Sequence, residues 1–296
     1  METSGIVVSM VIPAYNEHEA IGPVLRDLIV VMDGLALGYE IIVVDDGSTD
    51  DTAAQSSRYD NVRVISHTQN RGTGAARTTG VRAALGKYIV MTDADGTYPA
   101  GAIPEMIRVL DEGAHMVIGA REREAGTVAW LRRPAKDFIR RLASYMVEYR
   151  IPDLNSGLRA MRKDLVERFY GILPNSHSWV STITMAALSS GYMVRWIPIE
   201  YHERIGRSTF HPVRDTYNYL TLVIRTIMYF NPLRLFIPAC GLLFLAGFIK
   251  LVVDLFRFQF TGHVPASTVI ILLGAVQVAA IGLLADLIVK VSRLRN

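Results

Sequence analysis

The 296-residue chain has a single cysteine, Cys240. A disulfide framework and a cysteine-based metal cluster are therefore both excluded. Internal repeats and low-complexity segments are also lacking. The N-terminus has neither the basic segment nor the cleavage site of a signal peptide, and its apolar run over residues 6–12 is only as long as a strand. We therefore expect the N-terminal part of the protein to stay in the cytoplasm.

Charged residues become scarce toward the C-terminus. Half of all residues are hydrophobic and the net charge is only +3, but the apolar residues are unevenly distributed. Residues 235–256 and 264–289 are each close to the roughly 20 residues needed to span a bilayer, and neither is shorter. Two buried core helices are the alternative, but a small soluble domain does not need two apolar segments of this length. We predict a two-helix transmembrane hairpin within residues 231–296.

Basic residues flank the two predicted spans on the side of the chain ends. Cytoplasmic flanks carry an excess of lysine and arginine, so this pattern favours both termini in the cytoplasm, although Arg257 in the intervening loop reduces the bias. We therefore predict an integral membrane protein of the cytoplasmic membrane or of an equivalent membrane. The flanking residues are Arg225, Arg234, Lys290, Arg293 and Arg295.

Short apolar runs rich in β-branched residues alternate with helix-patterned segments in the first half of the chain. Strands that alternate with helices predict a doubly wound, mostly parallel α/β sheet. Ligands of such sheets bind outside the carboxyl ends of the strands. The predicted strands are residues 6–12, 40–44, 62–65, 88–92 and 117–121.

The fourth predicted strand ends in Asp93-Ala94-Asp95-Gly96. Alternation along a strand turns both carboxylates to one side, and such a pair suits Mg²⁺ or Mn²⁺, whose other ligands are water and substrate phosphates. A solvated turn is the alternative. It is disfavoured because polar residues follow the other predicted strands at the same edge of the sheet, namely Tyr15, Asp45, Asp46 and Asn70.

These segments resemble the motifs of family 2 glycosyltransferases, which have the GT-A fold. They occur in family order between residue 6 and about residue 210, and they are most similar to those of polyprenyl-phosphate glycosyltransferases, including dolichol-phosphate mannose synthases. Gly72 and Gly74 do not form a dinucleotide fingerprint, because that fingerprint follows the first strand and needs a third glycine. The matching segments are residues 13–17 (PAYNE), 43–48 (VVDDGS), 70–76 (NRGTGAA), 93–96 (DADG), 155–159 (NSGLR) and 203–208 (ERIGRS).

The resemblance implies a role for individual residues on the donor side. Arg121 is expected to reach the phosphates of a nucleotide sugar, while Asp93 and Asp95 hold Mg²⁺ or Mn²⁺. The residues expected to hold the nucleoside are Pro13, Tyr15, Glu17 and one of Asp45 and Asp46.

On the acceptor side, the resemblance implies a polyprenyl phosphate held by Arg140, Ser144 and Arg204. An acceptor phosphate is already anionic at neutral pH, so it needs no catalytic base, and we expect inversion in one displacement. Residues 130–149 mix cations with large apolar side chains, which is typical of a helix in the membrane interface. An ordinary amphipathic surface helix remains open for this segment.

The predicted organisation is a cytoplasmic catalytic domain over residues 1–210, a juxtamembrane amphipathic helix over residues 211–230, and the hairpin.

Two residues depart from the pattern of mannose synthases. Thr97 stands where those enzymes have glutamine, and Thr209 stands where lysine is usual. Both departures make a donor other than GDP-mannose plausible, and the base and sugar of the donor stay open.

Two other functions compete with transfer to a polyprenyl phosphate. A family 2 enzyme that glycosylates a glycan or a glycerolipid would need a base, for which Asp153 is the nearest candidate in the sequence. A non-catalytic membrane scaffold would need no metal site, which the intact Asp93-Ala94-Asp95 motif argues against. We expect the lipid bilayer and no nucleic acid as a partner, and a homo-oligomer remains open.

Overall fold

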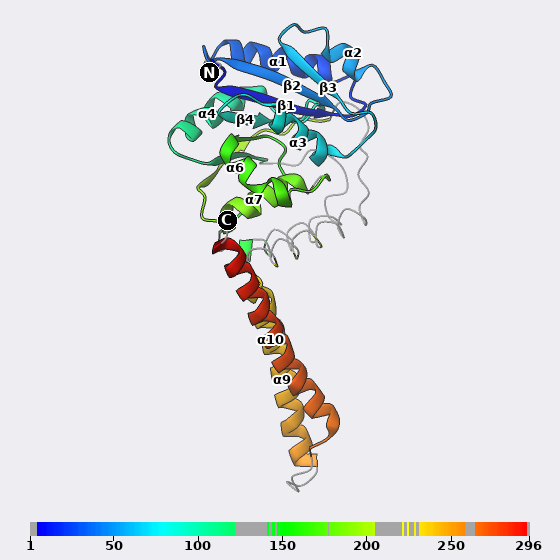
Figure 1. Ribbon diagram of the computed structural model, residues 1–296, viewed down its shortest axis with the longest axis vertical. Coiled ribbons are helices and arrows are strands. Elements are labelled where there is room, and N and C mark those ends of the chain that lie inside the picture. Colours follow the sequence, from blue (N-terminus) through cyan, green and yellow to red (C-terminus); the bar gives the residue numbers. More distant parts are fainter. Residues whose placement is uncertain are drawn as a thin grey trace. The chain divides into compact units, whose positions relative to one another are not determined.

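The computed structural model describes residues 5–121, 141, 144–145, 147, 149–176, 178–204, 221, 224, 228, 231–257 and 264–294. The chain divides into two compact units, Met1–Leu222 and Val223–Asn296. The first unit is an α/β domain, and the second contains two long helices (Figure 1). The predicted helix over residues 211–230 lies almost entirely outside the described residues, so the predicted division at residues 210 and 231 stays a prediction.

One mixed sheet of seven strands forms the first unit, in the order β3-β2-β1-β4-β6-β5-β7. β1 pairs in parallel with β2 and β4, β2 with β3, and β5 with β7. The predicted mostly parallel α/β sheet is thus confirmed. The strands are β1 (Val8–Ala14), β2 (Tyr39–Asp45), β3 (Val62–Ser66), β4 (Tyr88–Met91), β5 (Met116–Arg121), β6 (Arg159–Arg162) and β7 (Val194–Ile199).

β1 runs two residues beyond its predicted end. Pro13 and Ala14 continue the pairing with Val44 and Asp45 of β2. Pro13 is tolerated there because it lies near the end of the strand, past the last residue of β1 that pairs with β4. Pro13 and Asp45 are therefore brought to the carboxyl edge of the sheet together.

Helices cover both faces of the sheet. α1 (Ile21–Asp33) and α4 (Ile103–Asp111) share one hydrophobic core with the central strands. α3 (Thr73–Ala83) lies on the opposite side (Figure 1), so close that a Cβ at Gly80 would meet Val11 Cγ1 at 2.3 Å. The other described helices are α2 (Thr52–Ser56), α6 (Lys163–Phe169) and α7 (Trp179–Ser189), with 3₁₀ turns at η1 (Ala100–Ala102) and η2 (Tyr170–Ile172).

α1 shows why the sequence folds in this way. Its fully buried positions recur every three or four residues, which places them on one face of a helix. This face packs on the sheet and the other face carries polar residues. The buried positions are Ile21, Leu25, Leu28 and Met32.

β6 was not predicted and runs antiparallel to both of its neighbours, β4 and β5. Because of this reversal, the start of β6 lies at the same edge of the sheet as the end of β4, with Arg159 opposite Met91. The segment that precedes β6 therefore reaches the edge where ligands of α/β proteins bind.

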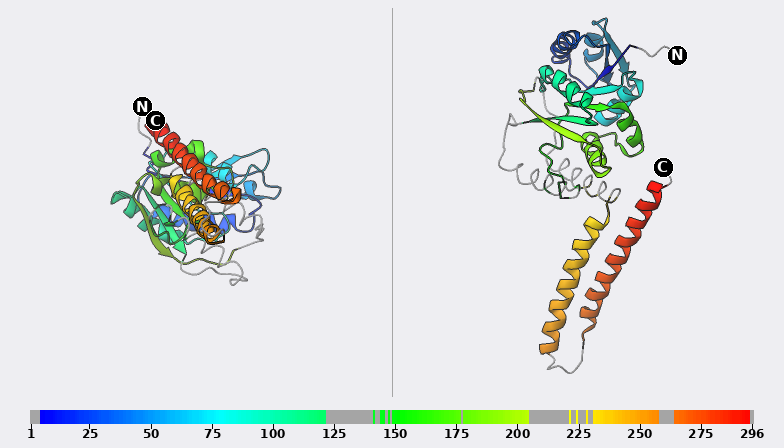
Figure 2. Two further views of the ribbon diagram at one scale, coloured as in Figure 1. Left: turned by 90° about the horizontal axis from the view of Figure 1, so that it is seen from below. Right: turned by 90° about the vertical axis from the view of Figure 1, so that its left-hand side faces the viewer.

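The second unit is a hairpin of α9 (Leu233–Arg257) and α10 (Ala266–Leu294), which lie side by side (Figure 2). Both helices are long and apolar enough to cross a membrane, and only 6% and 17% of their apolar windows are buried. Helices from a soluble core would be mostly buried. The predicted span over residues 235–256 lies inside α9, whereas α10 begins two residues after the predicted residue 264.

Polar side chains connect the two helices near their turn. Lys250 and Asp254, four residues apart in α9, form an ion pair with 3.1 Å between Nζ and Oδ2. Thr268 of α10 donates its hydroxyl to the same Asp254 oxygen. Asp254 is thus satisfied within the hairpin, as a charge in apolar surroundings requires.

Candidate active site

The two aspartates of the Asp93-Ala94-Asp95 motif lie in the turn after β4. β4 ends at Met91, so the strand alternation on which the prediction of a shared side was based does not apply to them. Burial raises the pKa of Asp95, and the charge of the neighbouring Asp93 acts in the same direction. The two carboxylates are therefore placed by a turn and not by a strand.

Arg204 connects this turn with the end of β1. Its guanidinium donates to Glu17 Oε1, and its second terminal nitrogen lies 3.6 Å from Asp95 Oδ2. Burial raises the pKa of Glu17 to about 7, although Arg204 acts in the opposite direction. Three carboxylates therefore gather here, and the protein disfavours the charged form of at least two of them.

Asp93 is held from two sides. Arg77 of α3 donates to Asp93 Oδ1 at 2.8 Å. On the other side, a Cβ at Gly157 would lie 2.4 Å from Asp93 Oδ2, so a glycine is required there. The Gly157 N–H donates to the Tyr98 hydroxyl at 2.7 Å. The segment before β6 thus helps to place the Asp93 carboxylate.

Arg121 at the end of β5 forms a two-point ion pair with Asp153. Nε donates to Oδ2 at 2.6 Å and the terminal nitrogen to Oδ1 at 2.9 Å. Asp153 also accepts a bond from the Asn155 N–H. These interactions, Arg121 first among them, lower the pKa of Asp153 against the effect of burial. The Arg121 guanidinium also lies over the ring of Tyr201, 5.3 Å from its centre.

Asp45 and Asp46 are both buried but have different partners. The Asp46 carboxylate binds the His67 ring at 2.7 Å and accepts bonds from the N–H groups of Arg71 and Gly72. Both of its oxygens are thus engaged in holding the glycine turn before α3. The Asp45 carboxylate accepts a hydrogen bond at Oδ1 from the N–H of Ser48, at 3.1 Å.

The other predicted site residues are more scattered. Tyr15 is 40% exposed beside the end of β1, where a ring can lie against a base. The Ser144 hydroxyl accepts a bond from the Ile151 N–H at 3.1 Å, so it also closes a local turn. Arg140 and Thr209 lie outside the described residues, as does most of the predicted interfacial helix.

The acidic turn suits a hard divalent cation. Asp93 and Asp95 supply oxygen ligands, and Mg²⁺ or Mn²⁺ usually takes one or two carboxylates and completes its shell with water and phosphate. Among the described residues there is no group of three or more His, Cys, Asp or Glu side chains arranged for a metal. The remaining ligands would therefore come from water and substrate.

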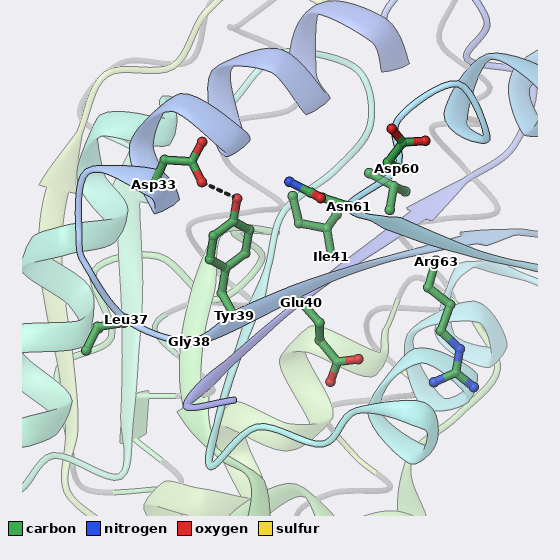
Figure 3. A pocket seen from close by; sticks show the side chains of 10 residues that line it. Asp33, Leu37, Gly38, Tyr39, Glu40, Ile41, Asp60, Asn61 and Arg63 are labelled. Atoms are coloured by element: carbon green, nitrogen blue, oxygen red, sulfur yellow. Dashed lines mark hydrogen bonds between the residues drawn. The ribbon is translucent and has the colours of Figure 1, made fainter. Parts of the chain in front are cut away.

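A pocket at the opposite end of the strands is separate from this site (Figure 3). It opens where β2 and β3 begin and is lined by Tyr39, Glu40, Asn61 and Arg63, among others. The Tyr39 hydroxyl donates to Asp33 Oδ1 at 2.6 Å. The site residues follow the carboxyl ends of the strands, so the pocket is not part of the candidate active site.

Several residues that shape the site were not singled out from the sequence. Arg77 directly follows a recognised motif, and Tyr98 and Tyr201 each lie two residues from another one. Their positions near motifs were the only feature of the sequence that could have indicated a role in the site. Their partners come from distant parts of the chain, and no local pattern indicates which side chain will meet which.

Comparison with known proteins agrees with this geometry. The model of Glycosyl transferase family 2 matches residues 9–169, more than half of the chain. A second model, the GtrB C-terminal hairpin, matches residues 231–291. The dolichyl-phosphate hexose transferase of Haloferax volcanii is 30% identical over 212 residues, which are 69% of this chain and 87% of that protein.

Solved structures show the same fold. Glucosyl-3-phosphoglycerate synthase from Mycobacterium tuberculosis, in complex with phosphoglyceric acid, has a TM-score of 0.59 at 22% identity and covers 75% of this chain and 80% of its own. The same enzyme with Mn²⁺, uridine diphosphate and phosphoglyceric acid has a TM-score of 0.60 at 21% identity, with coverages of 75% and 79%. The apolar hairpin indicates membrane association. Motifs, GT-A sheet and acidic turn agree with the sequence match: this chain belongs to glycosyltransferase family 2.

Proposed function

We propose that this glycosyltransferase moves a hexose from a nucleotide sugar, GDP-mannose or a UDP-hexose, to a polyprenyl phosphate such as dolichyl or undecaprenyl phosphate. The activity of the Haloferax relative supports the acceptor class. The complexes of the structural relatives with Mn²⁺ and uridine diphosphate support a nucleotide-sugar donor and a divalent cation. The flanking basic residues support a catalytic unit and chain ends on the cytoplasmic side, with α9 and α10 crossing the bilayer.

The ion pair between Asp153 and Arg121 is the observation that most supports a phosphate acceptor over a hydroxyl acceptor. Transfer to a hydroxyl needs a base that removes a proton. Asp153, the residue considered for that role, has both oxygens on Arg121 and a lowered pKa. Such a carboxylate is a poor base. A phosphate acceptor needs none, because its oxygen is already anionic.

Glu17 favours a second candidate function. Its pKa of about 7 suits a general base at neutral pH, so transfer to a hydroxyl of a glycan or glycerolipid has one group that fits. Against it, the Glu17 carboxylate accepts a bond from Arg204. An arginine at this position is better suited to attract a phosphate than a neutral hydroxyl.

On the donor side, we propose that Tyr15 and Pro13 contact the nucleoside together with Asp45. Asp46 is assigned to the glycine turn because both of its oxygens are engaged there. Glu17, which accepts a bond from Arg204, is also proposed to contact the nucleoside. Asp93 and Asp95 would hold Mg²⁺ or Mn²⁺, which supplies positive charge for the leaving diphosphate, and Arg121 adds a guanidinium to the same phosphates.

The transfer is one in-line displacement. An oxygen of the acceptor phosphate forms a bond to the anomeric carbon while the bond from that carbon to the donor diphosphate breaks. The electron pair leaves with the diphosphate and no proton has to move. Attack from the opposite face inverts the configuration. Arg204, Arg140 and Ser144 are the proposed contacts of the acceptor phosphate.

Product mass gives a direct test. The full chain in detergent is incubated with GDP- or UDP-hexoses and either a short-chain polyprenyl phosphate or a neutral lipid. We expect a hexosyl phosphate diester from one donor, lost in EDTA and restored by Mg²⁺ or Mn²⁺. Transfer to the neutral lipid alone, abolished by Glu17→Gln, would establish the second candidate instead.

A further inference from the structure

Thr97 is buried next to the acidic turn that contains Asp93 and Asp95, and it contacts this turn directly. It is 1% exposed. Its hydroxyl donates to Asp95 Oδ1 at 2.7 Å, and its N–H donates to the same oxygen at 3.2 Å. Threonine is stiff at its first side-chain torsion, so the two bonds fix the rotation of the Asp95 carboxylate. The second oxygen, Oδ2, is left on the side of Arg204.

The same short segment holds the chain that carries Arg204. The Thr97 carbonyl accepts a bond from the His202 N–H at 3.0 Å. The rings of Tyr98 and Tyr201 form a T-shaped pair, with 5.4 Å between their centres. A backbone bond and a ring contact thus join the residues after Asp95 to the residues before Arg204.

These contacts connect Thr97, Asp95 and the segment that carries Arg204 to one another. Thr97 fixes Asp95 Oδ1 and anchors the segment before Arg204, and the Arg204 guanidinium returns to within 3.6 Å of Asp95 Oδ2. A divalent cation and this guanidinium are both positive and both lie near the same oxygen. Binding of the cation therefore weakens one of the two carboxylate contacts of Arg204, the one to Asp95, and leaves Glu17 as its remaining carboxylate partner.

We propose that Thr97 is a positioning residue that aims Asp95 Oδ2 at the cation and carries the Arg204 segment, so that cation binding makes Arg204 available to an acceptor phosphate. The coupling to the acceptor rests on the proposed function. The effect of Thr97 on cation binding does not, because it depends only on the bond between Thr97 and Asp95.

The first experiment measures Mn²⁺ binding to the full chain in detergent by electron paramagnetic resonance. Thr97→Val keeps the shape of the side chain and removes the hydroxyl. Loss of a partner that orients a metal ligand typically weakens binding ten- to a hundredfold, and we expect at least tenfold here. Thr97→Ser retains the hydroxyl and should bind Mn²⁺ within about threefold of wild type.

Two comparisons keep this test decisive. Thr182→Val removes another buried hydroxyl, which donates to the carbonyl of Ser178 just before α7, and should leave Mn²⁺ binding unchanged. If Thr97→Val does not fold, Thr97→Ala and Thr97→Ser differ by one hydroxyl and replace it. Equal Mn²⁺ affinity of the hydroxyl-bearing and hydroxyl-free variants would overturn the role of Thr97.

The second experiment measures the coupling. Binding of a short-chain polyprenyl phosphate is titrated with and without saturating Mn²⁺. We expect Mn²⁺ to tighten acceptor binding about five- to tenfold in wild type, and Arg204→Gln to remove this effect while Mn²⁺ still binds. Acceptor binding that is independent of Mn²⁺ in wild type refutes the coupling. If no polyprenyl phosphate binds at all, the proposed acceptor is wrong, and the Mn²⁺ experiment still decides on Thr97.

Discussion

At the scale of single residues, the adjacent acids Asp45 and Asp46 have separate tasks. Asp46 holds the glycine turn through His67 and two backbone N–H groups, whereas Asp45 is the residue we assign to the nucleoside. Sequence alone cannot distinguish them, because both belong to one motif. The partners of Asp46 come from a different strand–helix connection, and the packing of the sheet brings them within reach.

We expect Asp46→Ala to destabilise the catalytic unit and Asp45→Ala to impair donor binding. Removal of one member of a buried charged network costs about 3–5 kcal/mol, or roughly 6–20 °C in Tm for a unit of this size. Thermal unfolding and nucleotide calorimetry are measured on both variants. The assignment fails if Asp45→Ala shows the larger loss of Tm and Asp46→Ala the larger loss of binding.

Glu17 gives the pH dependence of stability a predictable sign. Its pKa is raised from 4.5 to about 7 in the folded protein, so between these values the folded state binds more protons than the unfolded one. Its contribution to stability therefore falls as pH rises through this window. In EDTA, the Tm of Glu17→Gln minus that of wild type should increase as the pH rises from about 4.5 to 7.5. A constant difference in Tm across this range would contradict the raised pKa.

Most of the site could be located from the sequence, because motifs at strand ends converge on one edge of a parallel sheet. Asp93 and Asp95 were named from the end of a predicted strand, whereas Glu17 and Arg204 were named from the family resemblance. The structure brings Glu17 and Asp95 to Arg204. The link between Arg121 and Asp153 could not be foreseen, and it changes the meaning of Asp153 from a candidate base to the partner of an arginine. Such pairings depend on distances across the fold, which spacing along the chain does not contain.

At the scale of elements, β6 and β7 were both missing from the predicted strands, and β6 shows how a short strand can escape prediction. It is only four residues long, with arginine at both ends, and its pattern does not resemble the apolar runs of the parallel strands. Arg159 is nevertheless fully buried. It donates to the carbonyls of Val180 and Ser156 and to the Thr184 hydroxyl, and so joins the start of β6 to α7.

Arg159→Met should therefore destabilise the protein although it makes the core more apolar. The carbonyl of Ser156 and the Thr184 hydroxyl would lose their buried donor, and burial of unsatisfied groups costs about 1–3 kcal/mol each. We expect a loss of about 2–4 kcal/mol in chemical unfolding. Arg162→Met, at the partly exposed other end of β6, should change stability by less than about 0.5 kcal/mol. Similar effects of both substitutions would show that the buried bonds contribute little.

At the scale of the whole molecule, the two compact units predict that the catalytic unit folds alone. The shared core of strands and helices lies within residues 8–199, and the contacts of α9 are chiefly with α10. A chain that ends at residue 230 should be soluble, with a cooperative thermal transition, and should bind the donor nucleotide as the full chain does in detergent. Aggregation of this fragment, or loss of nucleotide binding, would show that the hairpin completes the catalytic unit.

The place of β6 in the sheet also has a consequence for synthesis on the ribosome. β5 leaves the ribosome before β6, yet β6 lies between β5 and β4. Until residue 162 has emerged, β4 offers an unpaired edge and β5 has no neighbour that joins it to the finished half of the sheet. Open strand edges pair readily with other chains. Nascent chains should thus need most protection from chaperones while the ribosome translates the stretch between β5 and β6. This need should fall when β6 closes the gap, and the outer edge of β5 stays open until β7 emerges.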